Sequence, residues 1–282
     1  MMTTSLNLNK NEIKNLKNFL SKNKVKKIDT KSKYELIRVK DGEINLILYK
    51  SGKLVYNESN SSLNIINSVL EKEKEFDYII GSDETGKGEW YGPLIVVATA
   101  LTSKDILKLR KIGVKDSKTI NRNKIFEIAK KLRNMSFERH SIILNPTTYN
   151  DLYVQFKIEN KNLNDLMAWA HSSVIQNLLE KIEYCKAKVI IDKFDFEKTE
   201  YRLKNINRTN LEIIQKSEAE SETPVAAASI IAKYLFEIEV NKLNEKYKID
   251  LRSSNPKGIN PKILPNVAKT HFKNVKTNLI GL

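Results

Sequence analysis

Apolar residues in the first quarter of the chain follow two different periods. Between residues 11 and 23 they recur every three or four positions, which predicts an amphipathic helix. In "INLILYK" and "KLVYN" they alternate with polar residues, and Asp41-Gly42 and Ser51-Gly52 are hairpin signals, so a small antiparallel sheet is predicted. A second helical stripe in "SSLNIINSVLEKEKE" ends in charged residues typical of a linker. We therefore predict a small α+β domain at residues 1–75 and a second domain at residues 76–282.

The second domain alternates short apolar runs with longer helical stripes. Hairpin strands come first and strand–helix units follow, which predicts an α/β fold with a mixed sheet flanked by helices. The predicted strands are 78–82, 94–101, 140–144, 188–192 and 211–214, and the predicted helices are 103–112, 121–135, 147–156, 163–184 and 225–247.

Composition narrows the class of protein. Of the 282 residues, 40% are hydrophobic and 29% are charged, which suits a soluble protein with two cores. The net charge of +15 favours an acidic partner, first nucleic acid and second an anionic membrane surface. An AT-rich genome, which enriches Lys, Asn and Ile together, is an alternative source of this charge.

Cysteine content and hydropathy exclude further classes. The single cysteine, Cys185, excludes an internal disulfide and a multi-cysteine zinc site. The N-terminus lacks the apolar segment of a signal peptide, and no apolar run approaches the roughly 20 residues that cross a membrane. We expect a cytoplasmic protein.

Carboxylate residues gather where predicted strands end. Asp83 and Glu84 follow a short apolar run, Asp192 ends the run in "KVIIDKF", and Glu220 precedes a strongly apolar helix. Clustered carboxylates raise one another's pKa unless a cation neutralises them. Because all the ligands would be oxygens, the cation would be a hard one, Mg²⁺ or Mn²⁺. Together with the basic surface, this points to phosphodiester chemistry, in which two metal ions can clamp the attacking water and the leaving oxygen.

The acidic residues before the last long helix also have a simpler explanation. Glu218, Glu220 and Glu222 lie where acidic side chains complement a helix dipole. Glu218 and Glu222 therefore compete with Glu220 for the fourth ligand position, and Asp195 competes more weakly with Asp192. The small residues at 226–229 would let the helix lie close against another backbone.

Glycines follow the first carboxylate pair. Gly86 and Gly88 would let backbone N–H groups approach a ligand closely, and Lys87 adds a positive charge for a phosphate. A tight hairpin turn explains these residues almost as well. Their position two residues after Glu84 favours the ligand-binding interpretation.

Ordered motifs in the second domain resemble those of ribonuclease HIII, a bacterial type 2 ribonuclease H. They are "GSDETGKGEWYGPLIVVA", "VKDSK", "NKNLNDLMAWAH", "IIDKF", "AESETPVAAASIIAKY", "PKGINP" and "VAKTHFKN". "LYKSGKLVYN" resembles a segment of that family's TATA-binding-protein-like substrate-binding domain. Ribonuclease HII usually has Gly-Arg-Gly in place of Gly86-Lys87-Gly88, Asp in place of Glu220, and no such N-terminal domain.

The resemblance implies a ribonuclease H-like mixed sheet and an endonuclease that hydrolyses the RNA strand of RNA–DNA hybrids. The products would carry 5′-phosphate and 3′-hydroxyl ends. The Gly86–Gly88 backbone would contact the ribose 2′-hydroxyl, Lys118 would contact a phosphate near the cleavage site, and Ser117 would shape that contact. The metal ions would be held by four catalytic residues, Asp83, Glu84, Asp192 and Glu220.

Two other functions stay open at this point. One is cleavage at single ribonucleotides in duplex DNA, as by ribonuclease HII, and the other is non-catalytic binding of nucleic acid with vestigial carboxylates. We expect an RNA–DNA hybrid as partner, with no membrane and no obligate protein partner. Lys233 and Lys269 are candidate phosphate contacts. The catalytic set leaves out the three histidines, which have no partner at ligand spacing, and Trp90 and Tyr91, which are expected to pack in the core.

Overall fold

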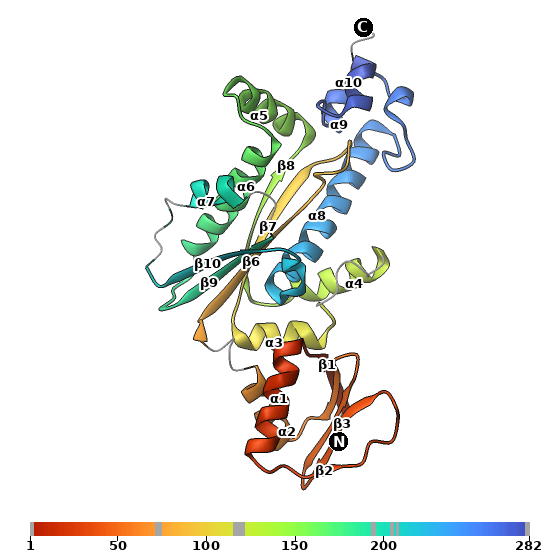
Figure 1. Ribbon diagram of the computed structural model, residues 1–282. Coiled ribbons are helices and arrows are strands. Elements are labelled where there is room, and N and C mark those ends of the chain that lie inside the picture. Colours follow the sequence, from red (N-terminus) through yellow and green to blue (C-terminus); the bar gives the residue numbers. More distant parts are fainter. Residues whose placement is uncertain are drawn as a thin grey trace.

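The computed structural model describes residues 3–70, 75–114, 122–192, 196–203, 206 and 209–279. Within them the chain forms two five-stranded sheets (Figure 1). Each sheet has its own hydrophobic packing: one core lies on the first sheet and two lie on opposite faces of the second. The charged segment 71–74, which the sequence predicts to be a linker, lies outside the described residues.

The N-terminal sheet is antiparallel, with strand order β1-β5-β4-β3-β2. The predicted turns are confirmed, because Gly42 and Gly52 adopt the left-handed backbone that favours glycine, with φ of +52° and +87°. The two helices cover one face, where they share a core with alternate strand residues. The elements are β1 (Thr3–Asn7), α1 (Lys10–Lys22), β2 (Lys27–Ile28), β3 (Glu35–Asp41), β4 (Ile44–Tyr49), β5 (Lys53–Asn57) and α2 (Asn60–Val69).

The second sheet is mixed, with strand order β10-β9-β6-β7-β8. β6, β7 and β8 are antiparallel neighbours, whereas β9 runs parallel to both β6 and β10. The strands are β6 (Tyr78–Thr85), β7 (Leu94–Leu101), β8 (Glu138–Leu144), β9 (Ala187–Asp192) and β10 (Leu211–Lys216).

Helices cover both faces of this sheet. α8 packs on β6 and β7 from one side and α6 packs on β7 from the other. Ile95 and Val97 therefore lie in one core while Val96 and Ala98 lie in the other, which explains why β7 is apolar along its whole length. The helices are α3 (Ser103–Lys111), α4 (Arg122–Arg133), α5 (Pro146–Ile158), α6 (Leu163–Leu179), α7 (Phe196–Leu203), α8 (Thr223–Tyr247), α9 (Leu264–Val267) and α10 (Lys273–Leu279). Two 3₁₀ turns are η2 (Ala219–Ser221) and η3 (Pro256–Gly258).

The first turn of α8 crosses β6 at very short range. A Cβ atom added at Gly81 would lie 2.3 Å from the backbone nitrogen of Val225, so only glycine fits there. The small residues at 226–229 allow this approach, as the sequence predicts. The crossing brings α8 against the strand that carries Asp83.

Several elements differ from the sequence predictions. The strand predicted at 78–82 continues to Thr85, because its pairing with β7 extends through the polar residues Asp83 and Glu84. The helix predicted at 163–184 ends at Leu179, and the chain then turns toward β9 through backbone bonds to the carboxylate of Asp77. β1, α7, α9 and α10 have too few apolar residues or turns to be predicted from periodicity. None of the described helices combines the length and apolar character needed to cross a membrane.

Candidate active site

Two neighbouring parallel strands bring three of the predicted carboxylates, Asp83, Glu84 and Asp192, to the same end of the sheet. We call this end of the strands the carboxylate edge. Ser82 on β6 pairs with Ile191 on β9. The next residues along each strand are Asp83 and Asp192, so the two lie at the same level, just beyond the last pair between β6 and β9. Glu84 follows Asp83 directly. The parallel pairing thus joins residues that are more than a hundred positions apart in the sequence.

The fourth carboxylate, Glu220, is brought to the same edge by a 3₁₀ turn. The backbone N–H of Ala219 donates to Oδ1 of Asp192 at 3.2 Å. This bond holds η2, and Glu220 within it, beside the end of β9. Of the two competing residues, Glu222 forms an ion pair with Lys216, and Glu218 has a left-handed backbone with φ of 57°.

The side chains of Asp83 and Glu84 lie on opposite faces of β6. Ile79 and Gly81 contact the α8 side of the strand, and Asp83 follows them with a hydrogen bond to Ser229 on α8. Burial, and then the neighbouring charge of Glu84, raise the pKa of Asp83 to about 7, against the bond from Ser229. Only 8% of Asp83 is exposed. A buried carboxylate in this state is stabilised by any cation that can reach it.

Glu84 faces α6 and is held by His171. Nε2 of His171 lies 3.2 Å from Oε2 of Glu84, and Nδ1 lies 2.9 Å from the hydroxyl of Ser82. Because a carboxylate only accepts hydrogen bonds, Nε2 carries the hydrogen, and Nδ1 of a neutral ring accepts from Ser82. Burial raises the pKa of Glu84, but the bond from His171 and the charge of Lys87 outweigh it, so that pKa lies below its usual value.

Sequence reasoning missed this role of His171. The residue is packed in the core, since only 1% of it is exposed. However, packing places its ring between two polar residues of β6 that share a face because they are two positions apart. A histidine on the apolar face of a helix could have been matched to a buried serine, but only once α6 was known to cover β6.

The two glycines of the loop, Gly86 and Gly88, have different surroundings. Gly86 has φ of +92°, and a Cβ atom there would lie 2.1 Å from the carbonyl oxygen of Pro93, so the turn requires glycine. Apart from its two chain neighbours, no residue that the structure describes has a heavy atom within 4 Å of a Cβ built at Gly88. The fold therefore does not explain Gly88, which leaves room for a ligand to approach the backbone. Lys87 lies 3.7 Å from Glu84.

A cavity of about 330 Å³ opens beside this loop. Lys233 and Arg122 line it from α8 and α4, together with Gly86 and Gly88. This position keeps Lys233 as a candidate phosphate contact.

Lys269, the other lysine considered for phosphate contact, is fully buried instead. Its Nζ donates to the carbonyl oxygens of Glu89 (3.0 Å), Tyr91 (3.0 Å) and Gly92 (2.8 Å). Burial lowers the pKa of Lys269 to about 7, while the three acceptors match the three N–H groups of its charged form. Lys269 thus supports the glycine loop from below, and Trp90 and Tyr91 pack against the core as predicted. Ser117, Lys118 and Asp195 lie outside the described residues.

The donor chemistry at the sheet edge suits a hard divalent cation. The four predicted ligands offer only carboxylate oxygens, which Mg²⁺ and Mn²⁺ prefer. In the part of the chain that the structure describes, no three His, Cys, Asp or Glu side chains converge as a ready-made metal site. Asp83 and Glu84 lie on opposite faces of β6, as consecutive residues of a strand do, which separates their carboxylates.

Comparison with known proteins shows the family to which the chain belongs. Residues 80–275 match the sequence model of the family Ribonuclease HII, so the second domain is a type 2 ribonuclease H. Ribonuclease HIII of Chlamydia pneumoniae is 33% identical over 268 residues, covering 84% of this chain and 86% of that protein. Ribonuclease HIII of Bacillus anthracis (strain CDC 684 / NRRL 3495) is 35% identical over 218 residues, covering 70% of this chain and 67% of that protein. The chain belongs to the ribonuclease HIII family.

Solved structures agree with this fold along nearly the whole chain. The crystal structure of Bst-RNase HIII in complex with Mn²⁺ has a TM-score of 0.63 at 22% identity, and covers 99% of this chain and 98% of that chain. Aquifex aeolicus RNase H3 has a TM-score of 0.56 at 23% identity, covering 95% and 100%. The expected ribonuclease H-like fold, preceded by a small domain, is thereby confirmed. The protein is an endonucleolytic ribonuclease H.

Proposed function

We propose that this enzyme hydrolyses the RNA strand of RNA–DNA hybrids with a divalent cation, Mg²⁺ or Mn²⁺, held by Asp83, Glu84, Asp192 and Glu220. One observation carries the assignment: Asp83 and Asp192 directly follow the last pair between the parallel strands β6 and β9, and a backbone bond ties the turn containing Glu220 to Asp192. When bound, the cation would lower the pKa of a water molecule and stabilise negative charge on the phosphate.

The surrounding residues orient these ligands. Ser229 holds Asp83 by a hydrogen bond from α8, and His171 holds Glu84 from α6. Each of these bonds limits the rotamers that the carboxylate can adopt, which lowers the entropy lost on coordination. Water attack on the phosphodiester would leave a 5′-phosphate and a 3′-hydroxyl.

Selection of RNA over DNA is assigned to the glycine loop. The open space around Gly88 supports close approach of a ribose to the Gly86–Gly88 backbone, where a 2′-hydroxyl can both donate and accept hydrogen bonds. Lys87, between these two glycines, would supply a positive charge for the phosphates of the nucleic-acid backbone. Lys118 is proposed as a second phosphate contact, with Ser117 shaping it.

The N-terminal domain, proposed to span residues 1–75, is assigned to hybrid binding. Among the described residues, no helix packs on one face of its sheet, and a row of paired residues crosses four strands there: Ser5, Val55, Ile47 and Arg38, of which Arg38 is ion-paired with Glu35. Apolar and cationic side chains on an open sheet suit a sugar–phosphate surface. This supports the TATA-binding-protein-like assignment. We propose that the enzyme, with catalytic residues 76–282, works in the cytoplasm without an obligate protein partner.

The decisive experiment compares two substrates and one variant. Purified protein is given a continuous RNA–DNA hybrid and a DNA duplex with a single ribonucleotide, with and without Mg²⁺ or Mn²⁺. We expect cation-dependent cleavage of the continuous hybrid. Asp83→Asn should abolish cleavage while leaving hybrid binding in EDTA largely intact.

Other outcomes would each remove a part of the proposal. Preference for the single ribonucleotide would support the ribonuclease HII-like alternative. Wild-type cleavage by Asp83→Asn would remove the metal-site assignment. Hybrid binding without any cleavage would favour the non-catalytic alternative.

A further inference from the structure

Helix α3 follows β7 in the chain and is therefore part of the second domain, but it contacts both domains. Ile106 and Leu109 lie in the core that includes α8, while Leu107 packs against the core of the N-terminal domain. α3 also contacts β1 and α8. In Figure 1 it lies between the N-terminal domain and the rest of the molecule. This helix is therefore the described element through which a rigid link between the domains can pass.

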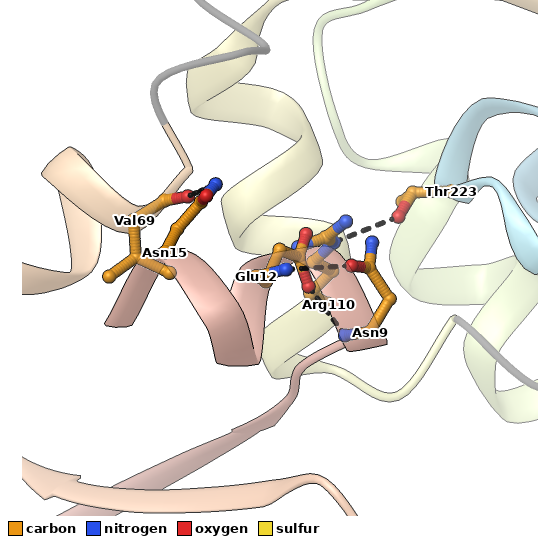
Figure 2. Close-up of polar contacts among 6 residues, drawn as sticks. All are labelled: Asn9, Glu12, Asn15, Val69, Arg110 and Thr223. Carbon is orange, nitrogen blue, oxygen red and sulfur yellow. Dashed lines mark hydrogen bonds and ion pairs between the residues drawn. The ribbon is translucent and has the colours of Figure 1, made fainter. Parts of the chain in front are cut away.

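A buried arginine on α3 makes such a link (Figure 2). Nη1 of Arg110 lies 2.6 Å from Oε1 of Glu12, which lies on α1 of the N-terminal domain. Nε of Arg110 donates to the hydroxyl of Thr223, the first residue of α8, at 3.2 Å. Arg110, Glu12 and Thr223 are 6%, 7% and 1% exposed. The guanidinium thus bonds simultaneously to both domains.

Both ends of this link are anchored. The second carboxylate oxygen of Glu12 accepts from the backbone N–H of Asn9 at 2.7 Å, and the side chain of Asn9 accepts from Glu12 N–H at 2.9 Å. This capping box fixes the start of α1. The hydroxyl of Thr223 lies three residues after Glu220, at the start of the helix that carries Ser229. The bonds of Arg110 therefore connect α1 to the start of α8, next to the turn that brings Glu220 to the carboxylate edge.

A buried charge pair of this kind specifies geometry. Apolar contacts such as that of Leu107 tolerate sliding and rotation, whereas a guanidinium satisfies its partners only in a narrow range of directions. An unpaired charge at this site would be strongly disfavoured, so orientations of the domains that separate Arg110 from Glu12 are suppressed. Lys111 and Glu58 form another pair between the domains at 3.0 Å, but both side chains are partly exposed to water.

We propose that Arg110 is a positioning residue that fixes the orientation of the N-terminal domain relative to the carboxylate edge. The N-terminal sheet then holds a hybrid at a set distance and angle from the site, and the two contact surfaces act as one bivalent grip. The effect on cleavage rests on the proposed function, but the contact between the domains does not.

The test separates stability from orientation. Arg110→Met removes the guanidinium and keeps an unbranched apolar stem, but it leaves Glu12 buried and unpaired. Glu12→Gln keeps an acceptor for the capping box. The double variant Glu12→Gln/Arg110→Met therefore removes both charges and retains the cap. Glu58→Gln is the matched control, because it breaks the exposed pair of the same interface.

Four readouts are compared in the full-length protein: Tm, the small-angle X-ray scattering profile, and the Kd and the cut-site distribution on an end-labelled hybrid. We expect Arg110→Met to lower Tm and the double variant to recover part of that loss. Both should scatter as a more extended, less uniform particle. Both should bind hybrid more weakly, on the order of tenfold, and cut over a broader set of positions, while Glu58→Gln behaves as wild type.

A folded double variant with the wild-type scattering profile would overturn the proposal, because orientation would then not depend on Arg110. A wild-type Kd and cut-site distribution in that variant would overturn it equally. If the wild-type protein fails to cut any hybrid, the proposed function fails instead, and the scattering comparison still decides whether Arg110 orients the domains.

Discussion

His171 lies 3.2 Å from Glu84 although the two residues are 87 positions apart in the chain. The same ring bonds to Ser82 at 2.9 Å, so one imidazole links two residues on one face of β6. Its own position is fixed by the packing of α6, in which it is almost completely buried. Glu84 is thus held in place by the packing of the fold itself.

We expect His171→Ala to lower both the affinity for Mn²⁺ and the cleavage rate by about 10- to 100-fold, as is usual for groups that orient metal ligands. His171→Gln should recover part of the loss, because its amide can still donate to Glu84. Calorimetric titration with Mn²⁺ measures the first effect without any substrate. Unchanged Mn²⁺ affinity in a folded His171→Ala protein would contradict the role.

The three glutamates before α8 can be ranked by single substitution. Glu220→Gln should reduce cleavage on the order of 100-fold, because it removes a charged ligand from the site. Glu218→Gln should have little effect, and Glu222→Gln should act mainly through its ion pair with Lys216. Initial rates on a hybrid at saturating Mg²⁺ give the order. If Glu218→Gln or Glu222→Gln is the most damaging change, the fourth ligand is a different glutamate.

Removal of the N-terminal domain should weaken binding more than chemistry. A protein starting near residue 76 is expected to cut hybrid but to bind it more weakly at moderate salt. Its affinity should also depend less steeply on salt, since it neutralises fewer phosphates. The truncation exposes Leu107 and leaves Arg110 without Glu12, so its folding must be verified by circular dichroism. Equal Kd and equal salt slope for the two folded proteins would exclude the N-terminal domain from binding.

His271 should make the protein less stable in mild acid. Its ring stacks on Tyr153 at 4.6 Å, and burial, followed by the charges of Lys269 and Lys157, lowers its pKa from 6.5 to about 4. Between these values the unfolded chain binds a proton that the folded protein does not. The stability that depends on neutral His271 is therefore fully present above about pH 6.5 and is lost as the pH falls toward 4.

After allowance for solvent screening of a half-buried ring, the loss should be about 1–2 kcal/mol. Urea unfolding across this pH window, for wild type and for His271→Phe, measures it. The phenylalanine keeps the stack without a titrating group, so its stability should vary less with pH. Parallel curves for the two proteins would exclude His271 as the cause.

Local patterns were sufficient for most of the fold. Alternation in β4 and β5 and the unbroken apolar run of β7 depend on which sheet faces are buried, and that requirement is written directly into successive residues. The glycine at position 86 is likewise determined by backbone geometry. A carboxylate directly after an apolar strand segment marks the same level in each of two parallel strands, which is why the sequence alone could predict Asp83 and Asp192 as neighbours.

The tertiary structure decided the contacts that join distant segments. The sequence by itself determined the two sheets and their helices, and it predicted a set of oxygen ligands, because periodicity and turn residues act within a few positions. It did not determine that His171 would hold Glu84, that Arg110 would bond to Glu12 and Thr223, or that Lys269 would be buried under the glycine loop. These pairs are 87 to 180 positions apart. Each depends on how whole helices pack, and a polar residue that is buried with a partner has the same local sequence pattern as one that is exposed to water.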